Sequence, residues 1–126
     1  MTLKERRKFM RIATENLQAD YWAKGPSMTT GQARVRDFCR EGLKVALQNP
    51  VHQGEHVDLT FKVPGDNVPI FATAEVAWAE VAKDQPSVGA GLKFVSIKAL
   101  DLARLLDFVY SQWLGGIRKS FSKQPM

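Results

Sequence analysis

Hydrophobic and polar residues alternate along several short segments of the chain, and turn-forming residues separate these segments. The clearest alternation runs over residues 56–63 (HVDLTFKV), where every second residue is apolar. A period of two places the apolar side chains on one face of a β-strand. We also predict strands over residues 43–47 and 68–81, over Thr30–Phe38 and Val88–Ile97, and a short strand within residues 10–22.

The segment Thr30–Phe38 (TGQARVRDF) carries charged residues on both faces near its end. Strict alternation predicts that one face holds Ala33, Val35 and Asp37. The other face then holds Arg34, Arg36 and Phe38.

From Lys98 onward the spacing of apolar residues becomes helical. Apolar side chains recur three and four residues apart, at Leu102, Leu105, Leu106, Val109 and Trp113. This spacing gathers them on one face of a helix. Glycines commonly end helices. Gly115 and Gly116 therefore predict a C-terminal helix over residues 98–116 and a disordered tail over residues 117–126.

The predicted strands are short, and turns that contain proline or glycine join them, as at residues 25–26, 49–50 and 64–67. Short strands at regular spacing are typical of a small antiparallel barrel or sandwich. No repeat, low-complexity segment or linker divides the 126 residues. We therefore predict a single, mainly β domain over residues 1–126, with one helix on or beside it.

The composition indicates a basic protein that can bury a core. Hydrophobic residues make up 44% of the chain, the formal net charge is +5, and the sequence pI is about 9.6. A positive balance favours an acidic partner, which includes phosphate ligands, nucleic acids and anionic membranes. The single cysteine, Cys39, excludes a disulfide within the chain and favours a reducing compartment. Because no apolar run is long enough to span a bilayer and no secretory signal is present, we expect a cytoplasmic protein without membrane insertion.

Residues that could carry catalysis or hold a metal are few. His52 and His56 flank a turn, and no cluster of carboxylates or thiols completes a metal site around them. Cys39 has no histidine near it in the sequence, and a small apolar role at a strand end is the simpler interpretation. Gly89 and Gly91 fit neither the dinucleotide fingerprint nor the P-loop. We therefore predict no enzyme, no metal and no cofactor.

The strongest remaining signal is cationic and lies near the start of the chain. In the segment ERRKFMR, Arg7 and Arg11 are spaced R-x-x-x-R, and Arg6 directly precedes them. Alone, this pattern also describes a solvated basic tail. Three further features change its interpretation: the stretch DFCREG over residues 37–42, the strand–turn–strand run that ends in VAW, and the run VGAGLKF over residues 88–94.

Together these features resemble the PilZ domain family, whose members are bacterial receptors for cyclic-di-GMP. The binding signature of that family is R-x-x-x-R followed by D/N-x-S-x-x-G. Arg7 and Arg11 match the first part of the signature. Asp37 and Gly42 match the second part, whereas Cys39 stands where the family has serine. The resemblance covers nearly the whole chain.

The resemblance implies a six-stranded antiparallel PilZ-type β-barrel with a C-terminal α-helix. Residues 1–11 would form a flexible arginine-bearing arm, residues 12–97 the barrel, residues 98–116 the helix and residues 117–126 the tail. When cyclic-di-GMP binds, the arm would become ordered over one face of the barrel. The new surface would then be read by an effector protein, which the sequence does not identify.

The resemblance also gives the arginines a role in binding the ligand. Arg7 and Arg11, assisted by Arg6, would contact phosphate oxygens or the O6/N7 edge of guanine. A guanidinium suits both targets, because it can donate two parallel hydrogen bonds.

The second part of the signature would contact the same ligand. Asp37 would accept hydrogen bonds from the N1 and N2 donors of guanine. Gly42 would allow tight backbone geometry or close approach of the ligand. Cys39 is a weaker donor than serine, so we expect it to weaken binding by about 1 kcal/mol.

Four further residues are secondary candidates for ligand contacts: Arg36, Trp78, Gly91 and Lys93. Trp78 could stack on a guanine at the edge of the site, but a place in the core is an equally good interpretation. Asp37 could pair with Arg36 and have no ligand role, and Gly42 could be only a turn glycine.

Two other functions remain open at this stage. The first is a PilZ module that has lost its ligand and acts through protein contacts, for example in pilus assembly or motility, and the substitution at Cys39 keeps it open. The second is a basic barrel that binds nucleic acid, which we do not expect. The helical apolar stripe could pack on the barrel or serve a dimer or a partner protein. Both a monomer and a homodimer are therefore compatible with the sequence.

Overall fold

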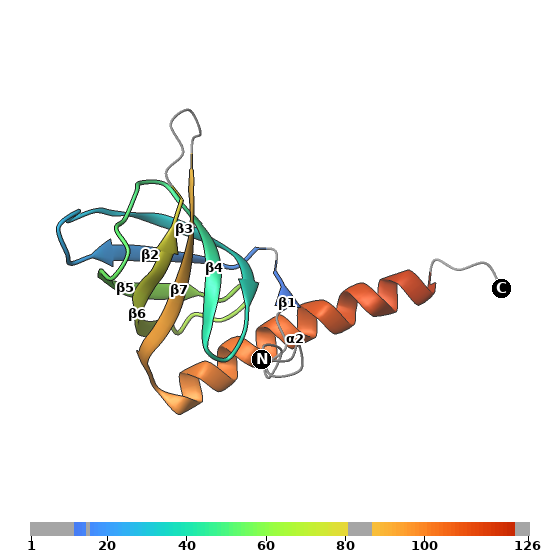
Figure 1. The fold of residues 1–126 in the computed structure, drawn as a ribbon. Coiled ribbons are helices and arrows are strands. Elements are labelled where there is room, and N and C mark those ends of the chain that lie inside the picture. The colour runs from blue at the N-terminus through green and yellow to red at the C-terminus, as the bar shows by residue number, and fades with distance from the viewer. Residues whose placement is uncertain (1–11, 15, 81–86, 123–126) are drawn as a thin grey trace, which may run out of the picture.

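The computed structural model describes residues 12–14, 16–80 and 87–122, and Figure 1 shows how the elements are arranged. Along the chain these are β1 (Ile12–Ala13), β2 (Gln18–Ala23), β3 (Thr30–Phe38), β4 (Gly42–Leu47), β5 (His56–Lys62), β6 (Ile70–Ala79), β7 (Val88–Ile97) and α2 (Ala99–Ser122). The bounds of β3 and β7 are those predicted from the sequence. The predicted strand over residues 68–81 is shorter at both ends, and residues 81–86 lie outside the described part of the chain.

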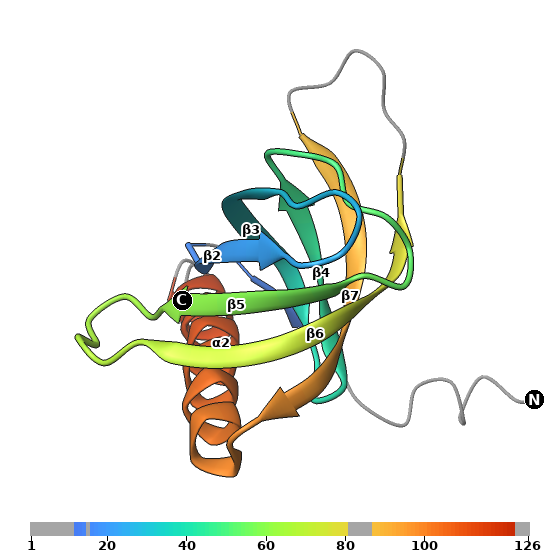
Figure 2. The ribbon, with the colours of Figure 1, turned by 90° about the vertical axis from the view of Figure 1, so that its left-hand side faces the viewer.

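Six of the strands close into an antiparallel barrel (Figure 1, Figure 2). The order of pairing is β3–β2–β5–β6–β7–β4, and β4 pairs again with β3, which closes the ring. The short strand β1 pairs with the end of β3 that lies beyond β2. The predicted six-stranded antiparallel barrel with a C-terminal helix is confirmed.

Alternating side chains from the strands fill the interior of the barrel. In β5, Val57, Leu59 and Phe61 are buried, whereas His56 and Lys62 are exposed. Complete burial of a side chain of this size contributes about 1.5–3 kcal/mol to folding. Since the interior is a packed core, ligands and partners must be bound on the outer wall or at the ends of the barrel.

A β-bulge near the end of β3 changes the predicted faces of this strand. Val35 pairs with Val45, but the next pair is Asp37 with Lys44, so that Arg36 is an extra residue on β3. An extra residue reverses the alternation beyond it. Phe38 is therefore buried with Val35 rather than exposed beside the arginines, and the prediction for its face was wrong.

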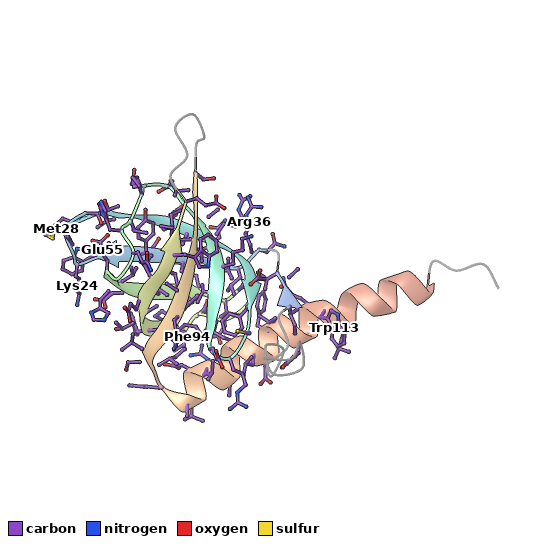
Figure 3. All side chains as sticks on the ribbon, in the orientation of Figure 1. Lys24, Met28, Arg36, Glu55, Phe94 and Trp113 are labelled. Atoms are coloured by element: carbon purple, nitrogen blue, oxygen red, sulfur yellow. The ribbon has the colours of Figure 1, made fainter. Side chains whose placement is uncertain are left out.

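The helix α2 packs against one end of the barrel and extends beyond it (Figure 1). Its Leu105 and Val109 are buried in the core, and Leu102 and Leu106 pack against that core. These four residues of the predicted apolar stripe therefore serve barrel packing. The fifth, Trp113, remains half exposed on the part of α2 that lies farther along (Figure 3).

The helix does not end where its glycines predicted. It continues through Gly115 and Gly116 to Ser122, so residues 117–122 are helical rather than a disordered tail. A glycine costs about 1 kcal/mol inside a helix relative to alanine, but it keeps its backbone N–H donor and so weakens a helix without stopping it. Among the described residues, no helix combines the length and the apolar character needed to cross a membrane.

Arg104 joins α2 to the turn between β5 and β6. Its guanidinium donates hydrogen bonds to Asp66 Oδ2 at 2.5 Å and to the Val68 carbonyl at 2.6 Å. It also contacts Asp101, one turn earlier on the helix, at 3.3 Å. The hydrogen bond from Arg104 holds the pKa of Asp66 below its ordinary value. This cluster fixes the first turns of α2 against the barrel.

At the opposite end of the barrel, the buried carboxylate of Glu55 holds two loops together (Figure 3). It accepts hydrogen bonds from the backbone N–H of Ser27 at 2.9 Å, from the Ser27 hydroxyl, and from the backbone N–H of His52 at 2.5 Å. Burial raises the pKa of Glu55, but the hydrogen bonds from Ser27 and His52 outweigh it, so that the pKa is lower than the ordinary 4.5. The charged form is therefore the one that the fold stabilises.

We expect Glu55→Gln to lower the free energy of unfolding by about 2 kcal/mol at neutral pH, because an amide cannot accept all of these hydrogen bonds. The pKa of Glu55 is lower in the folded than in the unfolded state, so its contribution is complete above the unfolded value and is lost as the pH falls through the folded one. The difference between wild type and variant should therefore shrink on acidification. Urea unfolding followed from about pH 7 to about pH 3 measures it.

Glu75→Gln is the matched control, because Glu75 is exposed on β6. It should change the free energy of unfolding by less than about 0.5 kcal/mol. Equal effects of the two substitutions, or a Glu55→Gln effect that does not depend on pH, would contradict the role given to the Glu55 carboxylate.

Candidate ligand-binding site

A row of side chains crosses the outer wall of the barrel beside β1. Asp37 on β3 is paired with Lys44 on β4, and Lys44 is paired with Gly91 on β7. Gly91 is in turn paired with Trp78 on β6. Each step between paired residues is about 5 Å, so the row brings a carboxylate, an ammonium and an indole within about 15 Å of one another.

A hollow of about 230 Å³ opens along the part of this row from Lys44 to Trp78, and Asp37 does not line it. Four of the residues predicted from the sequence line it, namely Gly42, Trp78, Gly91 and Lys93. They come from three strands that are distant in the sequence, and the closed sheet brings them together. The structure therefore gathers these candidates at one place.

Trp78 lies on the outer wall and does not belong to the core. It is 41% exposed, and a Cβ added to Gly91 would lie only 2.1 Å from its Nε1 atom. The indole therefore packs directly on the backbone of Gly91, and a larger residue there would force the indole to move. Lys44 Nζ is 5.8 Å from the centre of the ring, within the range of a cation–π contact. A flat aromatic surface with a cation above it suits a planar ligand that carries negative charge.

Gly42 is required by the contact between β4 and β7. A Cβ at this position would lie 2.0 Å from the carbonyl oxygen of Leu92. The residue belongs to a tight turn in which the N–H of Cys39 donates to the Gly42 carbonyl at 2.9 Å. The structure thus gives Gly42 a packing role, which is one of the two roles predicted from the sequence.

The remaining described candidates lie near the end of β3. Arg36 is exposed on the bulge and faces outward (Figure 3), whereas Asp37 is half buried. Arg36 and Lys44 also line a neighbouring hollow of about 240 Å³. Cys39 is only 7% exposed. It occupies a buried position at the strand end, as the simpler interpretation of the sequence predicted.

Arg6, Arg7 and Arg11 lie outside the described residues, but the chain that follows them is described. Ile12, which comes directly after Arg11, is paired with Phe38, and Ala13 is paired with Asp37. The buried hydroxyl of Thr14 donates a hydrogen bond to the Val35 carbonyl at 2.8 Å and fastens this segment to β3. The segment that carries the arginines therefore joins the barrel beside Asp37.

The sequence analysis did not single out Lys44, although it occupies the centre of the row. Its position follows from the turn between β3 and β4. Since Cys39 and Gly42 close that turn, the residues before and after it pair as Phe38 with Leu43 and Asp37 with Lys44. The hairpin signal was present in the sequence, but the length of its turn was not evident. Among the described residues, no cluster of metal-ligating side chains accompanies this site.

Solved structures share this fold at low sequence identity. The PilZ domain with c-di-GMP of YcgR from Escherichia coli superposes with a TM-score of 0.68 at 14% identity, over 94% of this chain and 99% of that one. The inhibitor of motility MotI/DgrA from Bacillus subtilis gives 0.65 at 18% identity, and MrkH of K. pneumonia in its apo state gives 0.65 at 15% identity. These matches cover 95% and 87% of this chain but 54% and 52% of the two solved chains, so it spans about half their length.

No curated protein matches the sequence significantly. The model of the PilZ domain, by contrast, matches residues 5–111, which is most of the chain. Proteins of this family are receptors and not enzymes, in agreement with the prediction from the sequence. The barrel, its closing helix and the matched residues lead to one assignment: the chain belongs to the PilZ domain family.

Proposed function

We propose that the protein is a receptor for cyclic-di-GMP and that the ligand binds on the outer wall along Asp37, Lys44, Gly91 and Trp78. Arg6, Arg7 and Arg11 would close over it from the other side. Family membership and the match between the arginine spacing and the family signature support this proposal.

The observation that carries the proposal is the pairing of β1 with the end of β3. Arg11 directly precedes Ile12, which is paired with Phe38 next to Asp37. An extended chain advances at most about 3.6 Å per residue, so Arg7 can lie up to about 18 Å from Ile12. The row from Asp37 to Trp78 is about 15 Å long by the same ladder spacing. The step from β1 to β3 adds about 5 Å, so the backbone of Arg7 can reach as far as Gly91 on β7, and the side chain of Arg7 extends the reach toward Trp78.

The chemistry of the row suits a nucleotide that has two guanines and two phosphates. The exposed face of Trp78 offers a surface for stacking a base. Lys44 and Lys93 supply positive charge for the phosphates, and Asp37 offers acceptors for the N1 and N2 donors of guanine. Arg7 and Arg11 would add paired hydrogen bonds, which lysines cannot form.

Binding would also act as a switch. Fixing the arm in one conformation costs about 1–2 kcal/mol of backbone entropy per residue, which the charge-assisted hydrogen bonds must exceed. The arm and the row would then form a surface that is absent without ligand. An effector protein that contacts both would respond to the concentration of the nucleotide.

We expect Arg7→Ala to weaken the binding of cyclic-di-GMP by at least about 100-fold, because it removes two charge-assisted hydrogen bonds. Isothermal titration calorimetry of the purified full chain measures the change. Lys8→Ala is the matched control, since it removes the same charge from the neighbouring position and should change the affinity only about twofold. If Arg7→Ala binds as the wild type does, the arginine assignment is wrong. If the wild type itself gives no heat, the protein is a PilZ module without the ligand.

Cys39→Ser should tighten the binding of cyclic-di-GMP by about fivefold, because a hydroxyl is a better hydrogen-bond donor than a thiol. The same titration tests this, with thermal unfolding of the free variant as a check on the fold at this buried position. Unchanged or weaker binding by a fully folded Cys39→Ser variant would remove Cys39 from the ligand site.

A further inference from the structure

A second hollow lies on the outer wall beside the nucleotide row, and the proposed nucleotide site does not use it. Its volume is about 240 Å³. On β4 it uses Ala46, about 7 Å along the strand from Lys44 of the nucleotide row. Its polar side chains are two arginines, three glutamines and one serine, namely Arg34, Arg36, Gln18, Gln32, Gln48 and Ser87. We call it the Arg34–Gln48 hollow.

The hollow forms because short residues follow long ones across the sheet. Gln18 on β2 is paired with Arg34 on β3, and Arg34 is paired with Ala46 on β4. Ala46 is in turn paired with Gly89 on β7. This row therefore begins with two long polar side chains and continues with a methyl group and a hydrogen. The wall is lower over β4 and β7 than over β2 and β3, which leaves room for the side chains of a ligand.

The glutamines supply both hydrogen-bond donors and acceptors. The backbone N–H of Gln32 donates to Gln48 Oε1 at 2.9 Å, and the backbone N–H of Gln48 donates to the Gln32 carbonyl at 3.3 Å. These two bonds hold Gln48 beside the hollow, and its amide nitrogen has no acceptor among the described residues. Gln18 and Gln32 are exposed and offer two further amides. Groups of both kinds are what a peptide backbone needs.

The two arginines carry charge that nothing near them balances. Both are exposed, and in the described part of the chain neither forms an ion pair with a carboxylate (Figure 3 shows Arg36). No aspartate or glutamate is among the described residues that line the hollow. The exposed cations of the neighbouring wall differ, because Lys24 is paired with Asp58 and Lys62 with Asp20. The hollow is thus a local site for anions.

The unbalanced positive charge is confined to a small area. On the β2 side, Asp20 is already paired with Lys62 at 3.6 Å, so that side adds no net charge. On the other side, Glu80 and Lys44 line the adjoining hollow, where the carboxylate offsets the ammonium. The two arginines are two residues apart on β3, which is at most about 7 Å along the strand. The patch therefore matches two acidic groups rather than a long anionic chain.

We infer that the Arg34–Gln48 hollow binds an acidic segment of a partner protein, with two carboxylates two residues apart. Alternate side chains of an extended segment are also about 7 Å apart. Each guanidinium can donate two parallel hydrogen bonds to a carboxylate, and the glutamine amides can pair with N–H and C=O groups of the segment. A nucleic-acid backbone offers only acceptors and requires a longer row of cations.

Recognition at this hollow must depend on side chains. The strand β3 is paired with β2 on one side and with β4 on the other, so the partner cannot add a strand beside it there. The partner would lie next to the proposed nucleotide, but the hollow is formed without ligand. The inference therefore does not depend on nucleotide binding.

A titration of the ¹⁵N-labelled full chain with the peptide acetyl-Thr-Glu-Thr-Glu-amide, without nucleotide and followed by NMR, tests this inference. We expect shifts of the backbone amides of Arg34 and Ala46 and of the side-chain amide of Gln48. The same peptide with glutamine in place of glutamate keeps the shape but loses the charge, and it should bind about tenfold more weakly. Arg34→Gln and Arg36→Gln should each weaken binding of the acidic peptide about fivefold.

Lys24→Gln is the matched control, because it removes the same charge from the side of the barrel away from Arg36 (Figure 3). It should change the affinity for the acidic peptide by less than about twofold. Equal binding of the two peptides would overturn the inference. An equal loss of affinity in Lys24→Gln and Arg34→Gln would also overturn it, as would shifts confined to Trp78 and Lys93.

Two other anions test whether the ligand is a protein segment. If inorganic phosphate causes the same shifts at the same concentration as the peptide, the hollow accepts any small anion and the inference is wrong. If a thymidine octamer shifts the same amides at a lower concentration than the peptide, in about 150 mM NaCl, the surface binds nucleic acid and the inference is again wrong. Because all these titrations omit cyclic-di-GMP, their outcome is separate from that of the proposed receptor function.

Discussion

The pairing of β3 with both β2 and β4 is the constraint on which the rest of the structure depends. It closes the sheet, so that every barrel strand has a neighbour on each side and the interior can be filled with side chains. In the part of the chain that the structure describes, side chains of the core fill this interior. Binding must take place outside, on rows of residues that run across neighbouring strands, and closure decides which residues share a row.

Closure of the barrel also accounts for the β-bulge at Arg36 and for the glycine at position 91. The extra residue Arg36 turns Phe38 into the core at the point where β3 meets β1 and β4. Gly91 leaves room for the indole of Trp78, and the two together form a flat outer surface. The end of β3, where Phe38 packs into the core, is therefore also the place where the segment that carries the arginines joins the barrel. Core packing at the end of β3 thus sets the point from which the arginine-bearing segment starts, and the proposed receptor depends on that point.

The strands could be predicted from the sequence because they depend on local signals, which left a barrel or a sandwich open. The choice of a six-stranded barrel came from the resemblance to the PilZ family. Alternation identified β3, β5 and β7, and turn residues marked their ends. The face of Phe38 and the end of α2 could not be predicted in this way. A bulge depends on the register between two strands, and a helix passes through glycines when nothing else terminates it. Lys44 was missed for a related reason, since its place opposite Asp37 depends on the length of a turn.

The candidate site could be predicted only in part, and the reason differs between its residues. Trp78, Gly91 and Lys93 were secondary candidates beside the family resemblance, and the structure brings them to one hollow. The arginines of the arm are identified by their spacing alone, and the packing of the barrel says nothing about where their side chains lie. A sequence signature thus carries two kinds of information, one about folding and the other about the ligand.

Gly42 belongs to the first kind. The carbonyl oxygen of Leu92 occupies the space that any larger residue would need, so barrel closure alone is sufficient to retain this glycine. A descendant of this chain that no longer recognised a nucleotide would still be under selection to keep it. When such domains are sorted into receptors and non-receptors, the final glycine of the motif therefore reports on architecture and does not discriminate between the two.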